Sequence, residues 1–161
     1  MNSKEKARDA ALRKLASHMR TEKEIRDHLK SLDFSPENVD DAAAFLKEYN
    51  YVDDEEYCRQ YYAAARRKGK AQYRIIRELE QKGIPSSVAR NVFEDMEDEG
   101  MSDREAALEI GLKMVRQQES ADCSDQKFLA RVGRRLAGLG YSSDICYYVM
   151  NKVKDYGKED E

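Results

Sequence analysis

A segment pattern that recurs about every 50 residues constrains the fold of this chain more than any other feature. Each copy reads as an amphipathic helix, a glycine or small polar residue, an apolar residue, and a helix start built on serine or proline. The copies lie at residues 24–37, 73–88 and 131–145. In each copy an aliphatic residue precedes a leucine by four positions, and the pairs are Ile25 and Leu29, Ile75 and Leu79, and Val132 and Leu136. Such a period predicts stacked supersecondary units rather than a globule around a central pocket.

Helix-start signals divide these units further. Thr21 and Glu24 have the spacing of a capping box, and Ser35 before Pro36 supplies an N-cap and a proline at the first helical position. A second capping box starts at Ser102. The first helix is expected over residues 4–19, and the eighth is expected to open at residue 124. No stretch of the chain has the pattern of a β-strand.

The sequence therefore predicts an all-α protein, an elongated array of three tandem three-helix repeats with about nine helices. The expected repeats are residues 1–52, 53–100 and 101–161. Charged residues make up 38% of the 161 positions, with 2 prolines and 8 glycines, which is typical of solvated helical proteins. No apolar run approaches the roughly 20 residues that span a bilayer, and the N-terminus lacks an apolar signal core. We expect a cytoplasmic monomer with no membrane association.

Basic residues cluster, although the net charge is −3. One cluster, near the middle of the chain, consists of Arg66, Arg67, Lys68, Lys70, Arg74 and Arg77. The other, in the third repeat, consists of Lys127, Arg131, Arg134 and Arg135. A single charged run is as often a solvated helix face as a binding surface. The recurrence of basic residues on the second helix of two repeats favours a binding surface.

The helix expected after Gly69 gives part of this surface a direction. Ile75, Ile76 and Leu79 are expected to face the core, so Arg74 and Arg77, three residues apart, are expected to face outward. Tyr73 flanks the basic run, where an aromatic ring either stacks on a base or partner, or packs at the rim of the core. Both interpretations of Tyr73 stay open at this point.

Several segments together resemble the RecX family, the bacterial regulatory proteins that act on the RecA recombinase. They are Tyr51-Val52-Asp53-Asp54-Glu55-Glu56-Tyr57, Arg66-Arg67-Lys68-Gly69-Lys70, Arg74-Ile75, Glu78-Leu79 and Lys82-Gly83-Ile84. The resemblance extends from about residue 10 to residue 152. It departs from the family pattern at Gln72 and Tyr73, where small or polar residues are common, and at Asp33, where the family often has glycine.

The resemblance implies a modular helical protein that binds along the groove of the RecA filament on single-stranded DNA. It also implies that the protein inhibits recombinase, ATPase and coprotease activity, and thereby regulates DNA repair, recombination and the SOS response. The two basic clusters and Tyr73 are the candidate contacts to the filament or its DNA, with weak direct DNA binding as an accompanying expectation.

Signatures of enzymes are missing from the sequence. His18 and His28 stand ten positions apart with no metal-binding spacing, and no glycine-rich phosphate loop occurs. We therefore expect no enzyme, no cofactor and no metal. The alternative function is a helical nucleic-acid-binding protein that uses the basic second helix of each repeat, as in helix-turn-helix proteins. The negative net charge argues against duplex binding as the main role.

Overall fold

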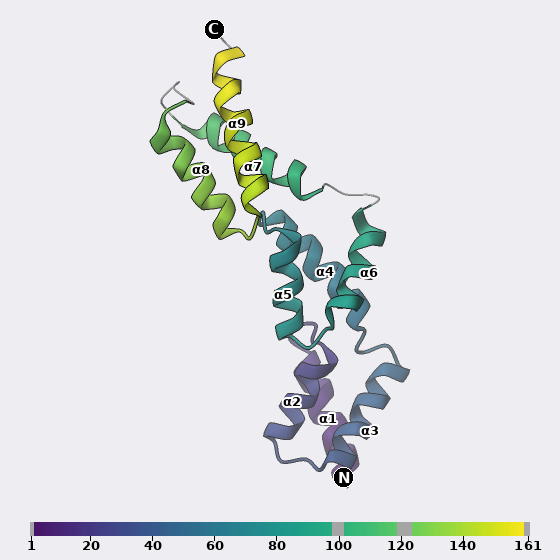
Figure 1. Ribbon diagram of the computed structural model, residues 1–161. Helices are drawn as coiled ribbons and strands as arrows, with labels where there is room; N and C mark the ends of the chain where they lie inside the picture. The colour runs from purple at the N-terminus through teal and green to yellow at the C-terminus, as the bar shows by residue number, and fades with distance from the viewer. Residues whose placement is uncertain (1, 98–101, 119–123, 160–161) are drawn as a thin grey trace. The chain divides into compact units, whose positions relative to one another are not determined.

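The computed structural model of the chain describes residues 2–97, 102–118 and 124–159, and this part contains nine α-helices and no β-strand (Figure 1). The helices are α1 (Ser3–Leu15), α2 (Glu22–Ser31), α3 (Pro36–Glu48), α4 (Asp54–Arg67), α5 (Gln72–Gln81), α6 (Ser86–Glu97), α7 (Asp103–Gln117), α8 (Gln126–Gly138) and α9 (Ser143–Glu159). The all-α class and the helical repeats expected from the sequence are confirmed. None of the described helices has the length and apolar character that a bilayer crossing needs.

By their packing, the helices divide into two compact units. Unit 1 consists of Met1–Tyr61 and Arg77–Phe93, and unit 2 consists of Tyr62–Ile76 and Glu94–Glu161. The boundary between the units therefore runs through α4 and α5. The division into three repeats at residues 52/53 and 100/101 stays a prediction.

In unit 1, α1, α2 and α3 pack against one another around a small core (Figure 1, purple to blue). Ile25 and Leu29, the apolar pair of the first repeat, are fully buried on α2. Alanines on α1 and α3 line the same core and allow the helices to approach closely. The core residues are Ala7, Ala11, Ile25, Leu29, Val39, Ala42, Leu46 and Val52.

In unit 2, α7, α8 and α9 pack in the same manner (Figure 1, green to yellow). Gly111 allows the close approach of α7 and α9, because a Cβ at this position would lie 2.5 Å from Cγ1 of Val149. Ala71, from the α4–α5 turn, belongs to the same core. The core residues are Ala71, Ala107, Phe128, Val132, Leu136, Tyr141, Cys146, Val149 and Val153.

The capping box at the start of α2 is present as the sequence predicted. The Thr21 hydroxyl oxygen accepts from the Glu24 N–H at 3.2 Å, and Glu24 Oε1 accepts from the Thr21 N–H at 3.0 Å. Ser35 caps α3 by accepting from the Asn38 N–H at 3.2 Å. At the start of α7, Ser102 likewise accepts from the N–H three residues ahead, at 3.2 Å. These starts were predictable because each cap depends on residues adjacent in sequence.

Two expected helix boundaries were wrong. The first helix ends at Leu15 rather than at residue 19, because the Ala16 N–H turns to bond the Arg13 carbonyl at 3.2 Å. The following residues form the turn that delivers Thr21 to its capping position. The eighth helix is capped by Asp125, whose carboxylate accepts from the Lys127 N–H at 3.0 Å, and not by the residue before it.

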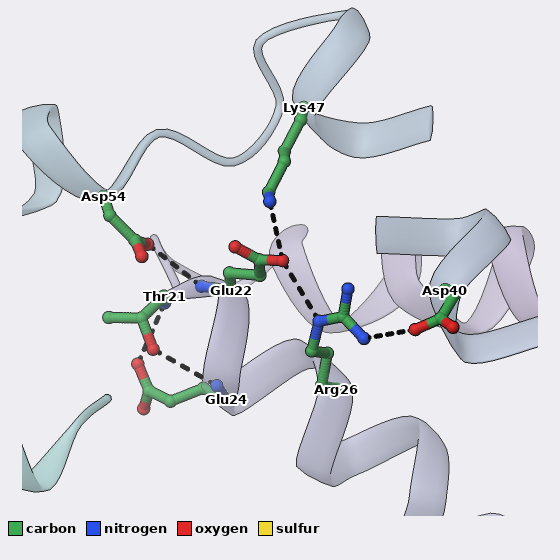
Figure 2. A network of polar contacts seen from close by, with 7 residues as sticks. All are labelled: Thr21, Glu22, Glu24, Arg26, Asp40, Lys47 and Asp54. Atoms are coloured by element: carbon green, nitrogen blue, oxygen red, sulfur yellow. Dashed lines mark hydrogen bonds and ion pairs between the residues drawn. The ribbon is translucent and has the colours of Figure 1, made fainter. Parts of the chain in front are cut away.

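Unit 1 contains a joint between the start of α2 and elements that lie far away in the sequence (Figure 2). Asp54 Oδ1, at the first position of α4, accepts from the Glu22 N–H at 3.0 Å. The Thr21 hydroxyl donates to the Lys82 carbonyl at 2.6 Å in the α5–α6 turn. Gly83, with φ +94°, lies so close that a Cβ would come within 2.2 Å of the Lys23 Cβ. The start of α2 is thus held by a carboxylate and by a glycine turn.

Ion pairs extend this joint across α2 and α3. Glu22 accepts from Arg26 Nε at 3.0 Å and from Lys47 Nζ at 2.8 Å, and Arg26 also contacts Asp40 at 2.7 Å (Figure 2). Burial raises the pKa of Glu22, but hydrogen bonds and charge from Lys47 and Arg26 outweigh burial and leave that pKa lowered. Glu22 is therefore ionised at neutral pH and joins the two helices.

Unit 2 repeats the same joint with different side chains. Asp103 Oδ1, at the first position of α7, accepts from the Gln72 N–H at 3.1 Å. The Ala71 N–H donates to the Leu139 carbonyl at 2.9 Å in the α8–α9 turn. Gly140, with φ +96°, lies close to the start of α5, as Gly83 lies close to the start of α2. The recurrence of this joint at a spacing of about 50 residues is the structural counterpart of the sequence repeat.

Candidate interaction surface

The exposed face of α8 carries four cationic side chains. Phe128, Val132 and Leu136, at four-residue spacing, are buried in the core of unit 2 and fix the rotation of the helix. The residues between them then point away from that core. The exposed cations are Lys127, Arg131, Arg134 and Arg135.

These four side chains lie in a helix without any acidic residue. Among the described residues, none of the four forms an ion pair. Arg131 has one packing contact, because its guanidinium carbon lies 5.3 Å from the centre of the Phe128 ring. Cations that lie along one helix face and form no ion pair with the described residues are suited to bind phosphates or carboxylates of a partner.

Arg66, the first residue of the other basic cluster, is bonded to other residues of unit 2. Its side chain is 14% exposed and lies 2.6 Å from Asp103 Oδ1. It also donates to the Tyr62 hydroxyl at 3.0 Å and to the Lys70 carbonyl at 3.2 Å. Burial lowers the pKa of Arg66, but the nearby Asp103 carboxylate and Tyr62 hydroxyl leave that pKa raised. Arg66 therefore holds the α4–α5 turn, and a direct contact to a partner would have to displace Asp103.

The next residues of this cluster lie on the surface of the turn. Arg67 and Lys68 are exposed at the end of α4 and form no ion pair with any described residue. Gly69, with φ +87°, reverses the chain, and the half-buried Lys70 follows. Tyr73 is 61% exposed, which favours surface contact over core packing, the two interpretations left open by the sequence.

Arg74 brings the two basic clusters together. It is exposed, as expected, and its guanidinium donates to the carbonyl of Gly138, the last residue of α8. A Cβ on Gly140 would lie 2.7 Å from the Arg74 Cβ, so the start of α5 sits directly against the α8–α9 turn. The basic face of α8 thus continues at its C-terminal end into the start of α5. We call the exposed members of this set, all in unit 2, the basic surface: Arg67, Lys68, Tyr73, Arg74, Lys127, Arg131, Arg134 and Arg135.

Arg77 belongs to unit 1, although it follows Arg74 on the same helix. It is exposed, and three-residue spacing places the two arginines on one side of α5. Arg77 is therefore an exposed cation of unit 1 and is described apart from the cations of unit 2.

Two partners of the basic residues were missed by sequence reasoning. Asp103 was assigned to a helix start, and the carbonyl of Gly138 carries no sequence signal. Both contacts bridge segments more than 35 residues apart, so no local pattern could have indicated them. In the part of the chain that the structure describes, no three His, Cys, Asp or Glu side chains come together as a possible metal site.

Comparison with known proteins gives two matches to family models. One is described as RecX, first three-helix domain, and matches residues 7–46. The other is described as RecX, second three-helix domain, and matches residues 53–92. These matches fall within the first and the second expected repeat.

Whole-chain relatives and solved structures agree with the family models. Regulatory protein RecX of Clostridium botulinum (strain Alaska E43 / Type E3) is 28% identical over 151 residues, covering 94% of this chain and 70% of the relative. Regulatory protein RecX of Bacillus subtilis (strain 168) is 27% identical, covering 93% of this chain and 56% of the relative. The crystal structure of RecX from Lactobacillus salivarius has a TM-score of 0.75 at 22% identity, covering 94% of this chain and 96% of that one. A further crystal structure of regulatory protein RecX has a TM-score of 0.72 at 25% identity, covering 92% and 73%.

Proposed function

Since this chain belongs to the RecX family of regulatory proteins, we propose that it binds the RecA filament on single-stranded DNA and inhibits recombinase, ATPase and coprotease activity. In the cell this activity would regulate DNA repair, recombination and the SOS response. The observation that carries the proposal is the basic surface, where the face of α8 meets Arg74 at the Gly138 carbonyl.

The electrostatics of the chain support a partner that presents both protein and DNA. The net charge is −3, so a basic surface coexists with acidic surfaces elsewhere. Lys127, Arg131 and Arg134 are four and three residues apart along one helix face, a spacing of about 5–6 Å that can follow successive phosphates or carboxylates. A filament offers both groups along its groove. A general duplex-binding protein would normally be basic overall.

We propose that the protein acts by binding alone, as a cytoplasmic monomer without cofactor. Exposed cations on α8 make the contact, while Arg66 keeps the α4–α5 turn in place through Asp103. Lys70 in unit 2 and Arg77 in unit 1 take part as secondary contacts. Inhibition then follows from occupancy of the filament rather than from chemistry.

The test is the ATPase of the cognate RecA recombinase on single-stranded DNA, with and without this protein. We expect inhibition by the parent chain and, for the double variant Arg131→Glu, Arg134→Glu, a requirement for at least about tenfold more protein, the scale of a hot-spot loss. The control Lys30→Glu, Arg90→Glu changes the net charge equally at two exposed cations of unit 1, and should inhibit like the parent.

Two outcomes would contradict different parts of this proposal. Unchanged ATPase and strand exchange in the presence of a large excess of the parent chain would refute the function itself. Full inhibition by the α8 double variant would leave the function standing and move the contact surface away from α8.

A second candidate function is direct nucleic-acid binding through the basic second helices. The acid-free exposed face of α8 is the observation that favours it. Titration with single-stranded and duplex DNA in the absence of recombinase separates the two functions. Binding to naked DNA as tight as binding to the filament would favour the second candidate.

A further inference from the structure

Three aromatic rings cluster on the surface of unit 1. Phe45 and Tyr49 lie near the end of α3, and Tyr51 follows in the next turn. The ring centroids are 5.0 Å apart for Phe45 and Tyr49, and 6.2 Å apart for Tyr49 and Tyr51, whose rings are stacked at 29°. Tyr49 is 57% exposed and Tyr51 is 54% exposed. We call these three residues the aromatic surface.

Backbone geometry holds the two tyrosines on the same side. Asn50 adopts φ +58°, the left-handed conformation that asparagine tolerates better than most residues. The Tyr51 N–H then donates to the Leu46 carbonyl at 2.8 Å, which closes the helix and folds the chain back. Val52 enters the core directly afterwards and anchors the turn. The exposure of both rings is therefore built into the end of α3.

The cluster already holds one guanidinium. The Arg8 guanidinium carbon lies 4.5 Å from the centre of the Phe45 ring, in the geometry of a cation–π contact. Asp41 fixes this arginine through two hydrogen bonds, of 2.9 and 3.0 Å. Phe45 thus has a cationic partner within the fold, whereas Tyr49 and Tyr51 are each more than half exposed.

Acidic residues flank the exposed tyrosines in the sequence. Glu48 and Asp53 flank the Tyr49–Tyr51 segment, both are exposed, and neither forms an ion pair within the described part of the chain. The Asp53 carboxylate accepts from the Glu56 N–H at 3.1 Å, as the N-cap of α4. This border attracts cations and repels phosphates, the opposite of the basic surface on α8.

We propose that the aromatic surface docks a basic segment of a protein partner, with an arginine or lysine side chain laid over the exposed rings of Tyr49 and Tyr51. Tyrosine and arginine are enriched among the residues that dominate interface energies, and an acidic rim favours a cationic partner. This inference rests on the proposed function, because the partner it names is the polypeptide part of the filament. The DNA part would be served by the basic surface.

The first experiment measures the affinity of the protein for a RecA filament on single-stranded DNA held by a non-hydrolysable ATP analogue. We expect the double variant Tyr49→Ser, Tyr51→Ser to bind at least about tenfold more weakly, because it removes both exposed rings. The double change of the same residues to Phe should bind like the parent, because the rings remain. The matched control is Tyr147→Ser, a tyrosine on α9 that is 65% exposed. Parent-like binding by the double serine variant, with circular dichroism showing an intact fold, would overturn the inference.

A second experiment identifies what touches the rings. Tyr49 is replaced by the photoreactive p-benzoylphenylalanine, and the bound filament is irradiated. A crosslink to the recombinase polypeptide is expected. A crosslink to the DNA, or none from a bound filament, would refute a protein occupant. If the parent chain does not bind the filament at all, the proposed function fails as well, which is a different result from loss of binding confined to the tyrosine variant.

Discussion

At the scale of single residues, a basic side chain can serve the fold or a partner, and burial distinguishes the two. Arg66 and Arg67 are neighbours in one basic cluster. Arg66 is mostly buried and contacts Asp103, whereas Arg67 is exposed and forms no ion pair with any described residue. Their substitution should therefore affect different properties of the protein.

We expect Arg66→Ala to lower the free energy of unfolding by about 2 kcal/mol, because it removes the ion pair to the half-buried Asp103 carboxylate and the hydrogen bond to the Lys70 carbonyl. Arg67→Ala should change stability by less than about 0.5 kcal/mol. Urea unfolding followed by circular dichroism measures both. Equal stability of the two variants would show that the Arg66 ion pair does not stabilise unit 2.

Asp54 gives a prediction on pH. Burial raises its pKa, the bond from the Glu22 N–H opposes this, and the Glu22 carboxylate raises the pKa again, so that the net pKa lies above the ordinary value of 3.8. The unfolded chain then loses the Asp54 proton at lower pH than the folded chain. Protonated Asp54 therefore stabilises the folded chain at pH values below its unfolded-state pKa. This stabilisation is lost as pH rises through the higher pKa of the folded chain.

We accordingly expect Asp54→Asn, which keeps an oxygen acceptor for the Glu22 N–H, to gain stability relative to the parent as pH rises from about 3 to 7. The gain should be at most about 1 kcal/mol, since Asp54 is only half-buried. Thermal unfolding of both chains across this pH range measures the difference. A difference that shrinks with rising pH would contradict the raised pKa.

At the scale of elements, two glycines near the end of α8 have opposite roles. Gly140 adopts φ +96° and leaves no room for a Cβ beside Arg74, whereas a Cβ on Gly138 would meet nothing within 4 Å. Gly140→Ala should therefore lower the free energy of unfolding by about 2 kcal/mol or more, through backbone strain and displacement of α5. Gly138→Ala should be neutral or stabilising, by up to about 1 kcal/mol. Thermal melts of both variants check this, and a stable Gly140→Ala chain would argue against the joint in unit 2.

The elements also show what a sequence can reveal. The caps at Thr21, Ser35 and Ser102 were predictable because the bonds they make span three residues. The early end of α1 was not, because it depends on where α2 must begin. For the candidate surface, helical spacing predicted that Arg74 and Arg77 face outward, and both are exposed. The ion pair of Arg66 with Asp103 and the hydrogen bond of Arg74 to the Gly138 carbonyl could not be predicted. Both depend on packing between distant segments, which local spacing does not encode.

At the scale of the whole molecule, binding through the basic surface should depend on salt. Each phosphate contact to single-stranded DNA contributes about −0.7 to the slope of log affinity against log salt concentration. The double variant Arg131→Gln, Arg134→Gln should therefore have a slope shallower by about 1.4 if both side chains contact phosphates. Filament binding at several salt concentrations measures this, and an unchanged slope would place these arginines away from phosphates.

The elongation expected from the repeat layout stays a prediction. Small-angle scattering measures it directly, because a compact chain of this length has a radius of gyration of roughly 15 Å. A clearly larger value is expected for an open array of repeats. A compact value would refute the open array while leaving the family membership intact.

The joint that occurs once in each unit has a consequence for how such chains evolve. The middle copy brings both halves of the connection: the capped start of α5, and a glycine turn at Gly83 together with Asp54, which caps the start of α2 in the first copy. Duplication of one gene segment of about 50 codons would supply a module that already fits its neighbours, with no new interface to be selected. Descendants of such a gene would differ in length by whole modules. Selection would remove deletions that cut through a module, because they would break its connection to the next one.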